Sequence, residues 1–149
     1  MREILFRGKC ISYDNDLNGK WIYGQLVIRT DHDDGDDKYF ICESGHQFIR
    51  CRSKMPCTYK VDPETVGQYI GLKDNAGRKI FEGDIVRYYS DIKDMFVGSP
   101  GVVRYGEFNC SCCNGVYGWY VEDGDIRDIL DNRIIGNIHD NPELLEAER

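Results

Sequence analysis

Short apolar and aromatic stretches alternate along most of the chain with clusters of Asp, Asn and Gly. The stretches have the length of strands rather than of helices, and the clusters are typical of turns. A turn-rich SYDNDLNG segment separates the first two stretches, and Glu-Ser-Gly-His separates the next two. The strands predicted in this first part of the chain are Ile4–Gly8, Lys20–Arg29, Tyr39–Cys42 and Gln47–Arg52.

The second part of the chain continues as a series of short strands. In GLKDNAGRKIFEGDIV, Gly71–Val86, either Asn75 or Gly77 can adopt the positive φ that reverses a hairpin. Gly83 and Gly101 have the spacing found at the start of small SH3-like barrels, and closing such a meander removes its edges. The predicted strands are Gln68–Lys73, Arg78–Phe81, Ile85–Ser90, Gly101–Phe108, Tyr117–Glu122 and Arg133–His139.

Helix signals occur at only two places. Asp62-Pro63 supplies a cap and a first-turn proline, and Asn141-Pro142-Glu143 repeats that start with an acidic first turn. We therefore expect short helices near 62–67 and 141–147. The predicted fold class is mainly β, a β-rich α+β protein. Residues 1–60 would form an N-terminal β lobe with an acidic loop at 31–37, and residues 61–149 a small SH3-like barrel with a short terminal helix.

The composition agrees with a mainly β fold and indicates in which surroundings the protein acts. Tyr, Phe and Trp are abundant, with 10, 6 and 2 residues among 149, which favours strands. The formal net charge of −7 opposes nonspecific attraction to nucleic acid or to an anionic membrane. MREILFRGK has no signal-peptide core, and the 7 cysteines are typical of reduced thiols. We expect a soluble cytoplasmic protein that binds no membrane.

The charges are unevenly distributed around the acidic loop. After DHDDGDD, the cations Arg50, Arg52 and Lys54 alternate with Cys51 and Ser53. Because side chains alternate along a strand, the three cations would share one face. That face is either an ordinary solvated surface or a binding site for an anion or a partner.

Two segments have features of metal sites. Asp14, Asp16 and Asn18 stand where a calcium loop places ligands, but its twelfth position is Gln25, so a hairpin turn is expected instead. The candidate zinc ligands do not form the two CxxC pairs of a typical structural zinc site, so we expect packed thiols and no metal or other cofactor. These candidates are Cys42, His46, Cys51, Cys57, Cys110, Cys112 and Cys113.

The sequence contains no clear catalytic motif either. A cysteine nucleophile with His46 or His139 as base would need an oxyanion site, and no motif for one is present. Aromatic residues of the C-terminal lobe would form either core and cross-strand pairs or a stacking surface for a peptide or single-stranded nucleic acid. They are Tyr88, Tyr89, Tyr105, Tyr117, Trp119 and Tyr120, of which Tyr117 and Trp119 are the main binding candidates.

Three sequence blocks resemble the YopX family of phage and prophage proteins. They are MREILFRGK with KWIYGQLV, then VDPETVGQYIGLKDNAGRKIFEGDIV, and finally IIGNIHDNPELL. The resemblance implies a β-rich protein that acts inside a bacterial host, and it implies no activity or catalytic residues. The chain departs from the typical pattern at Asp31–Pro56 and at CSCC.

These features together favour a noncatalytic accessory protein that binds another protein. Nucleic-acid binding through the barrel and the basic strand face is the first alternative, and a metal-dependent enzyme the second. In the turn-rich segment, Asp74, Glu82 and Asp84 either cap turns or take part in binding. We also expect a homo-oligomer formed by the N-terminal lobe, with Ile22 and Leu26 on its uncovered face.

Overall fold

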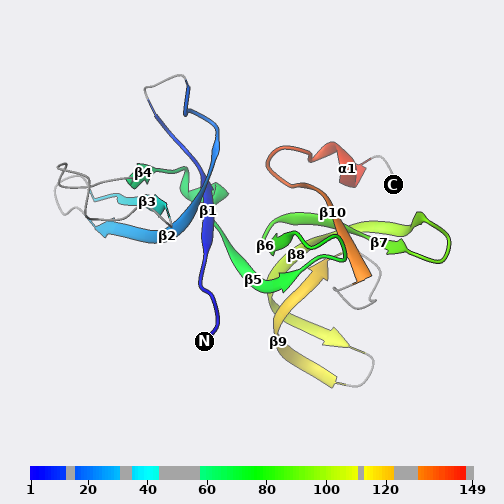
Figure 1. Ribbon diagram of the computed structural model, residues 1–149. Coiled ribbons are helices and arrows are strands. Elements are labelled where there is room, and N and C mark those ends of the chain that lie inside the picture. Colours follow the sequence, from blue (N-terminus) through cyan, green and yellow to red (C-terminus); the bar gives the residue numbers. More distant parts are fainter. Residues whose placement is uncertain (13–15, 31–34, 44–57, 111–112, 123–130, 147–149) are drawn as a thin grey trace. The chain divides into compact units, whose positions relative to one another are not determined.

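The computed structural model describes residues 1–12, 16–30, 35–43, 58–110, 113–122 and 131–146. The described chain is mainly β and divides into two compact units, Met1–Tyr69 and Ile70–Arg149 (Figure 1). The sequence had placed the boundary after residue 60. The division falls later because Thr65, Gly67 and Gln68 interact with the first strand of unit 1, as set out below.

Unit 1 is an antiparallel sheet with the strand order β4-β3-β2-β1-β5. Its strands are β1 (Phe6–Lys9), β2 (Trp21–Thr30), β3 (Asp37–Glu43), β4 (Thr58–Lys60) and the start of β5 (Gly67–Lys73). The predicted hairpin at residues 4–29 is confirmed, with β1 and β2 paired and Gly19 at φ 80° in the turn. The predicted strand Gln47–Arg52 lies outside the described residues, and β3 pairs instead with β4.

The calcium-loop segment forms part of this hairpin. Gly19 donates its N–H to the Cys10 carbonyl at 2.8 Å, and Asn18 accepts the N–H of Ser12 at 3.3 Å. Gln25, at the twelfth position of the loop, lies in β2 and donates its side-chain amide to the carbonyl of Ile4 at 2.9 Å. Asp14 lies outside the described residues. A strand therefore occupies the segment that would carry the second half of a calcium loop.

The core of unit 1 corrects one prediction. Ile22 is only 5% exposed and belongs to the buried cluster with Cys10, Ile41 and Val61, and Leu26 packs against that cluster. The face predicted to be uncovered is thus the core face. The opposite face of β2 carries the exposed side chains Tyr23 and Val27. Both faces of this strand are apolar, so alternation alone could not show which one turns inward.

The short helices are confirmed. Residues Pro63–Thr65 form a single 3₁₀ turn, η1, in which Asp62 accepts the N–H of Glu64 at 3.0 Å. Thr65 accepts the N–H of Lys9 at 2.9 Å, which ties η1 to β1. The second helix, α1, spans Glu143–Glu146. Among the described residues, neither helix has the length of apolar sequence that a membrane crossing requires.

Unit 2 contains the rest of β5, β6 (Lys79–Phe81) and an antiparallel sheet with the order β10-β7-β8-β9. Its strands are β7 (Asp84–Ser90), β8 (Met95–Cys110), β9 (Cys113–Glu122) and β10 (Asn132–Asn137). The core contains Ile70, Ile80, Val86 and Val103, with Trp119, Val121 and Ile134 packed against it.

The predicted SH3-like barrel is not confirmed. Over the described residues the sheet is open, with β10 at one end and β9 at the other. The difference arises in β8, which is a single strand of 16 residues rather than one that begins at Gly101. Residues up to Val102 pair with β7, whereas residues from Val102 onward pair with β9. Beyond Val103, β8 and β9 continue as a two-stranded ribbon (Figure 1).

Candidate functional site

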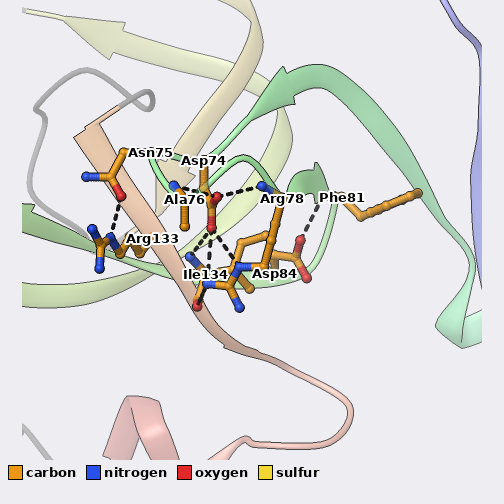
Figure 2. Close-up of polar contacts among 8 residues, drawn as sticks. All are labelled: Asp74, Asn75, Ala76, Arg78, Phe81, Asp84, Arg133 and Ile134. Atoms are coloured by element: carbon orange, nitrogen blue, oxygen red, sulfur yellow. Dashed lines mark hydrogen bonds and ion pairs between the residues drawn. The ribbon is translucent and has the colours of Figure 1, made fainter.

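Asp74, the first carboxylate of the turn-rich segment, holds the hairpin between β5 and β6 closed. Its Oδ1 atom accepts the backbone N–H groups of Ala76 at 3.0 Å and Arg78 at 2.8 Å (Figure 2). The backbone closes the same turn, because Asp74 donates to the Arg78 carbonyl at 2.8 Å and Gly77 adopts φ 85°. Gly77 is one of the two residues at which a positive φ was predicted for the chain reversal.

The other carboxylate oxygen of Asp74 ties this hairpin to β10. Its Oδ2 atom accepts the backbone N–H of Ile134 at 3.1 Å and the Nε–H of Arg78 at 3.1 Å. Arg78 also reaches the carbonyl of Ile134, and Asn75 donates its backbone N–H to the carbonyl of Asn132 at 3.2 Å. In Figure 2 the Asp74 side chain lies between the turn and β10, with donors on both sides.

These contacts keep Asp74 ionised. Burial by itself would raise its pKa, but the N–H donors of Arg78 and Ile134, the Arg78 charge and the N–H of Ala76 together lower the pKa below the ordinary value. The Asp74 side chain is 0% exposed, while that of Arg78 is 55% exposed. The hydrogen bonds to the backbone therefore matter more than the solvent-screened ion pair.

Asp84 stabilises a different turn. It is 2% exposed, and its Oδ2 atom accepts the N–H of Phe81 at 2.8 Å across the tight turn that contains Gly83 at φ 86° (Figure 2). Glu82, the remaining carboxylate nominated from the sequence, is half-buried in the same turn. The contacts of Asp74 and Asp84 are those of turn-forming residues, and a binding role for the three carboxylates stays a prediction.

Arg133 of β10 connects the Asp74 turn to the hairpin between β7 and β8. It donates from Nε to the side-chain oxygen of Asn75, and its guanidinium lies 3.5 Å from the ring centroid of Tyr89. The Tyr89 hydroxyl donates to Asp94, and this hydrogen bond, followed by desolvation, raises the pKa of Tyr89. No local sequence pattern indicates a role for Arg133, because its partners are distant along the chain.

The nominated aromatics Tyr117 and Trp119 lie on one face of the β8–β9 ribbon. Tyr105 is directly opposite Trp119, and the two rings meet edge to face with centroids 4.9 Å apart. Trp119 packs partly against the core of unit 2, whereas Tyr105 is 58% exposed and Tyr117 is 69% exposed. This face therefore changes along the ribbon from buried core to exposed aromatic surface.

The opposite face of the ribbon also carries aromatic rings. Gly106 and Gly118 are directly opposite each other, and the rings of Phe108 and Tyr120 lie diagonally across this pair. The two rings are stacked, with centroids 5.5 Å apart and an interplanar angle of 28°. A Cβ at Gly118 would lie 3.7 Å from the Phe108 ring, so the rings cover glycine backbone that would otherwise be open.

The remaining candidates are not brought together by the described structure. The basic residues Arg50, Arg52 and Lys54 and the ligands His46, Cys51, Cys57 and Cys112 lie outside the described residues, as do most of residues 31–37. Cys42 lies in β3, and the part of the chain that the structure describes holds no cluster of His, Cys, Asp or Glu able to bind a metal. The absence of zinc stays a prediction.

Comparisons with known proteins test the family first suggested by the sequence blocks. The crystal structure of protein EF1440 from Enterococcus faecalis is similar over 97% of this chain and 99% of that chain, with 21% identity and a TM-score of 0.44. No curated protein matches the chain. The family model described as YopX protein matches residues 18–146, which is most of the sequence. The chain therefore belongs to the YopX family.

Proposed function

We propose that this protein is a phage or prophage accessory protein that acts in the host cytoplasm by noncatalytic binding to another protein. The observation that carries the proposal is the β8–β9 ribbon, which presents Tyr105 and Tyr117 to solvent beside the half-buried Trp119. Tyr and Trp are enriched where proteins bind one another, because a rigid aromatic ring buries a large area at a low entropy cost.

The structure of the ribbon suits a binding surface. The half-buried ring of Trp119 packs on the core of unit 2, so the exposed ring of Tyr105, which contacts it, rests on an ordered support. On the other face, the Arg104 guanidinium and the Glu122 carboxylate pair at 2.9 Å and flank the stacked rings. Apolar rings bordered by paired charges are the usual composition of an interface core and its rim.

Capture from lysate of the bacterial host, using tagged protein, tests the proposal. The variant Tyr105→Ser with Tyr117→Ser removes the exposed rings of the ribbon, and Tyr23→Ser with Val27→Ser removes a similar apolar surface from unit 1. We expect a partner that the wild type and the unit 1 variant retain and the ribbon variant loses, with melting temperatures unchanged. A partner retained equally by all three proteins would place binding elsewhere.

Nucleic-acid binding is the second candidate, because stacked aromatic rings can also bind unpaired bases. The net charge of −7 opposes it. Fluorescence anisotropy with labelled single-stranded oligonucleotides at low and high salt separates the candidates. Binding that weakens steeply with salt would favour nucleic acid, since phosphate contacts release counterions. No binding at low salt would exclude it.

A further inference from the structure

The two ends of the sheet in unit 2 differ in how well they are protected against pairing with another strand. At one end, β10 carries Arg133, and a bulge between Ile134 and Gly136 interrupts its register. Bulges and charges are the usual protection of an edge strand. At the other end, the pairing of β9 with β8 is regular from Val116 to Glu122. Within the described residues, no strand pairs with the outer side of β9.

The sequence of β9 offers no protection of its own. Its residues from Asn114 to Val121 include no Lys, Arg, Asp, Glu or Pro, and its charged residue, Glu122, lies at the very end. An uncharged, regular edge that is rich in aromatic residues is a template for a further antiparallel strand. The strand that pairs with the outer edge of β9 therefore has to meet this edge without placing like charges opposite each other.

We propose that this strand is β9 of a second copy of the chain, paired antiparallel about a twofold axis at Trp119. This register uses the whole regular segment, because Trp119 is the middle residue of Val116–Glu122. Gly118 then lies opposite Tyr120 of the second copy, a small residue against a large one, and Glu122 lies opposite Val116. No charged residue meets another, and like charges directly opposite would be destabilising.

The twofold pairing has a consequence for the surface of the ribbon. Residues directly opposite in antiparallel strands point to the same side, so the rings of Tyr105, Tyr117 and Trp119 from both copies share one face of a continuous sheet. The dimer thus doubles the aromatic face that the proposed function assigns to partner binding. The pairing itself stands without that function, because it depends on the edge of β9 and not on its exposed rings.

The salt dependence of self-association distinguishes this contact from one held by ion pairs. Each copy carries a net charge of −7, and Glu122 in the paired edge faces no other charge, so the copies repel at long range while the contact itself gains nothing from charge. Salt screens that repulsion. Self-association should therefore strengthen as salt is raised. A short edge contact buries little area, so the dimer should be weak and should form only in the micromolar range or above.

Substitutions at Val116 test both the contact and its register. Val116→Glu would oppose the Glu122 of the second copy, and Val116→Lys would attract it, twice in each dimer by symmetry. Glu and Lys have similarly low strand propensities, so the pair controls for effects on folding. Because Arg104 already neutralises part of the Glu122 charge, we expect a roughly three- to tenfold weaker dimer for Val116→Glu than for Val116→Lys.

Sedimentation velocity across micromolar concentrations, at low and high salt, gives the dissociation constants, and circular dichroism checks that each variant is folded. A concentration-dependent dimer that salt strengthens and that follows the expected order at Val116 supports the proposal. A strictly monomeric wild type at high micromolar concentration overturns it. Equal dissociation constants for the two Val116 variants, or a dimer abolished by Tyr23→Lys in unit 1, would also overturn it by placing the interface elsewhere.

Discussion

Replacing Asp74 should cost unit 2 more stability than any other single change in the turn between β5 and β6. The Asp74→Ala variant leaves three backbone N–H groups without their acceptor, those of Ala76, Arg78 and Ile134. At about 1 kcal/mol for each lost hydrogen bond, the free energy of unfolding falls by about 3 kcal/mol. For a domain of this size that corresponds to a melting temperature lower by roughly 12–24 °C.

Two further variants separate the hydrogen bonds from the ion pair. Asp74→Asn keeps one acceptor oxygen but loses the other together with the charge, so its loss of stability should lie below that of Asp74→Ala. Arg78→Ala removes a guanidinium that is largely exposed and leaves the backbone donors satisfied. An exposed ion pair contributes about 0–1 kcal/mol, so this variant should be the mildest of the three.

The pH dependence follows from the lowered pKa of Asp74. Because the folded protein holds this pKa below its unfolded value, the stabilisation is fully present above the unfolded pKa of about 4 and is lost as pH falls through the folded pKa. The stability difference between the wild type and Asp74→Asn should therefore be largest near neutral pH. It should narrow progressively below about pH 4.

Unfolding is best followed by fluorescence, because each unit contains one of the two tryptophans. In a Trp21→Phe background, the emission of Trp119 reports unit 2 alone. Urea and thermal unfolding of the variants in this background give the required differences. An Asp74→Ala variant no less stable than Arg78→Ala would contradict the role assigned to the Asp74 hydrogen bonds. A stability difference between the wild type and Asp74→Asn that stays constant from pH 7 to pH 3 would contradict the lowered pKa of Asp74.

Three further outcomes are expected. Ile22→Lys should abolish the cooperative unfolding of unit 1, because it buries an unpaired ammonium in the core, whereas Tyr23→Lys on the exposed face should shift the melting temperature little; equal effects would contradict the assignment of the two faces. Protein purified without added metal should contain no stoichiometric zinc by elemental analysis, and about one zinc per chain, lost with structure on chelation, would contradict this. Millimolar calcium should leave the melting temperature unchanged, because a strand occupies the second half of the Asp14–Gln25 segment; a saturable increase would contradict it.

The sequence predicted local structure well where one short segment contains all the interacting groups. The cap at Asp62 and the reversal at Gly77 are both present, since each depends on residues within a few positions. For Asp74, local sequence patterns predict only part of the hydrogen bonding. Its bonds to Ala76 and Arg78 follow from the turn, but its bond to Ile134 joins positions 60 residues apart, and no local pattern indicates it.

The course of β8 was harder to predict for the opposite reason, because local signals favoured a break. The strand was predicted to begin at Gly101 from its spacing with Gly83, and Gly98 and Pro100, which precede it, are residues typical of turns. In the structure the register shifts between Val86 and Tyr88, and the residues that precede Gly101 bulge out of the pairing. Arg87 donates to the carbonyl of Gly98 at 2.7 Å across this irregularity. The strand β8 therefore continues through Gly98 and Pro100 with an irregular register instead of ending at them.

Stability and binding should be separable in this protein, because different residues of unit 2 carry them. The Asp74 carboxylate is buried and accepts hydrogen bonds within unit 2, so a change there alters the folded state first and binding only as a result. Among the described residues, β8 and β9 beyond Val103 pair only with each other, and Tyr105 and Tyr117 can be removed without opening a cavity in the core. A variant that loses a partner at an unchanged melting temperature would thus implicate the ribbon, whereas joint loss of both would indicate the Asp74 turn.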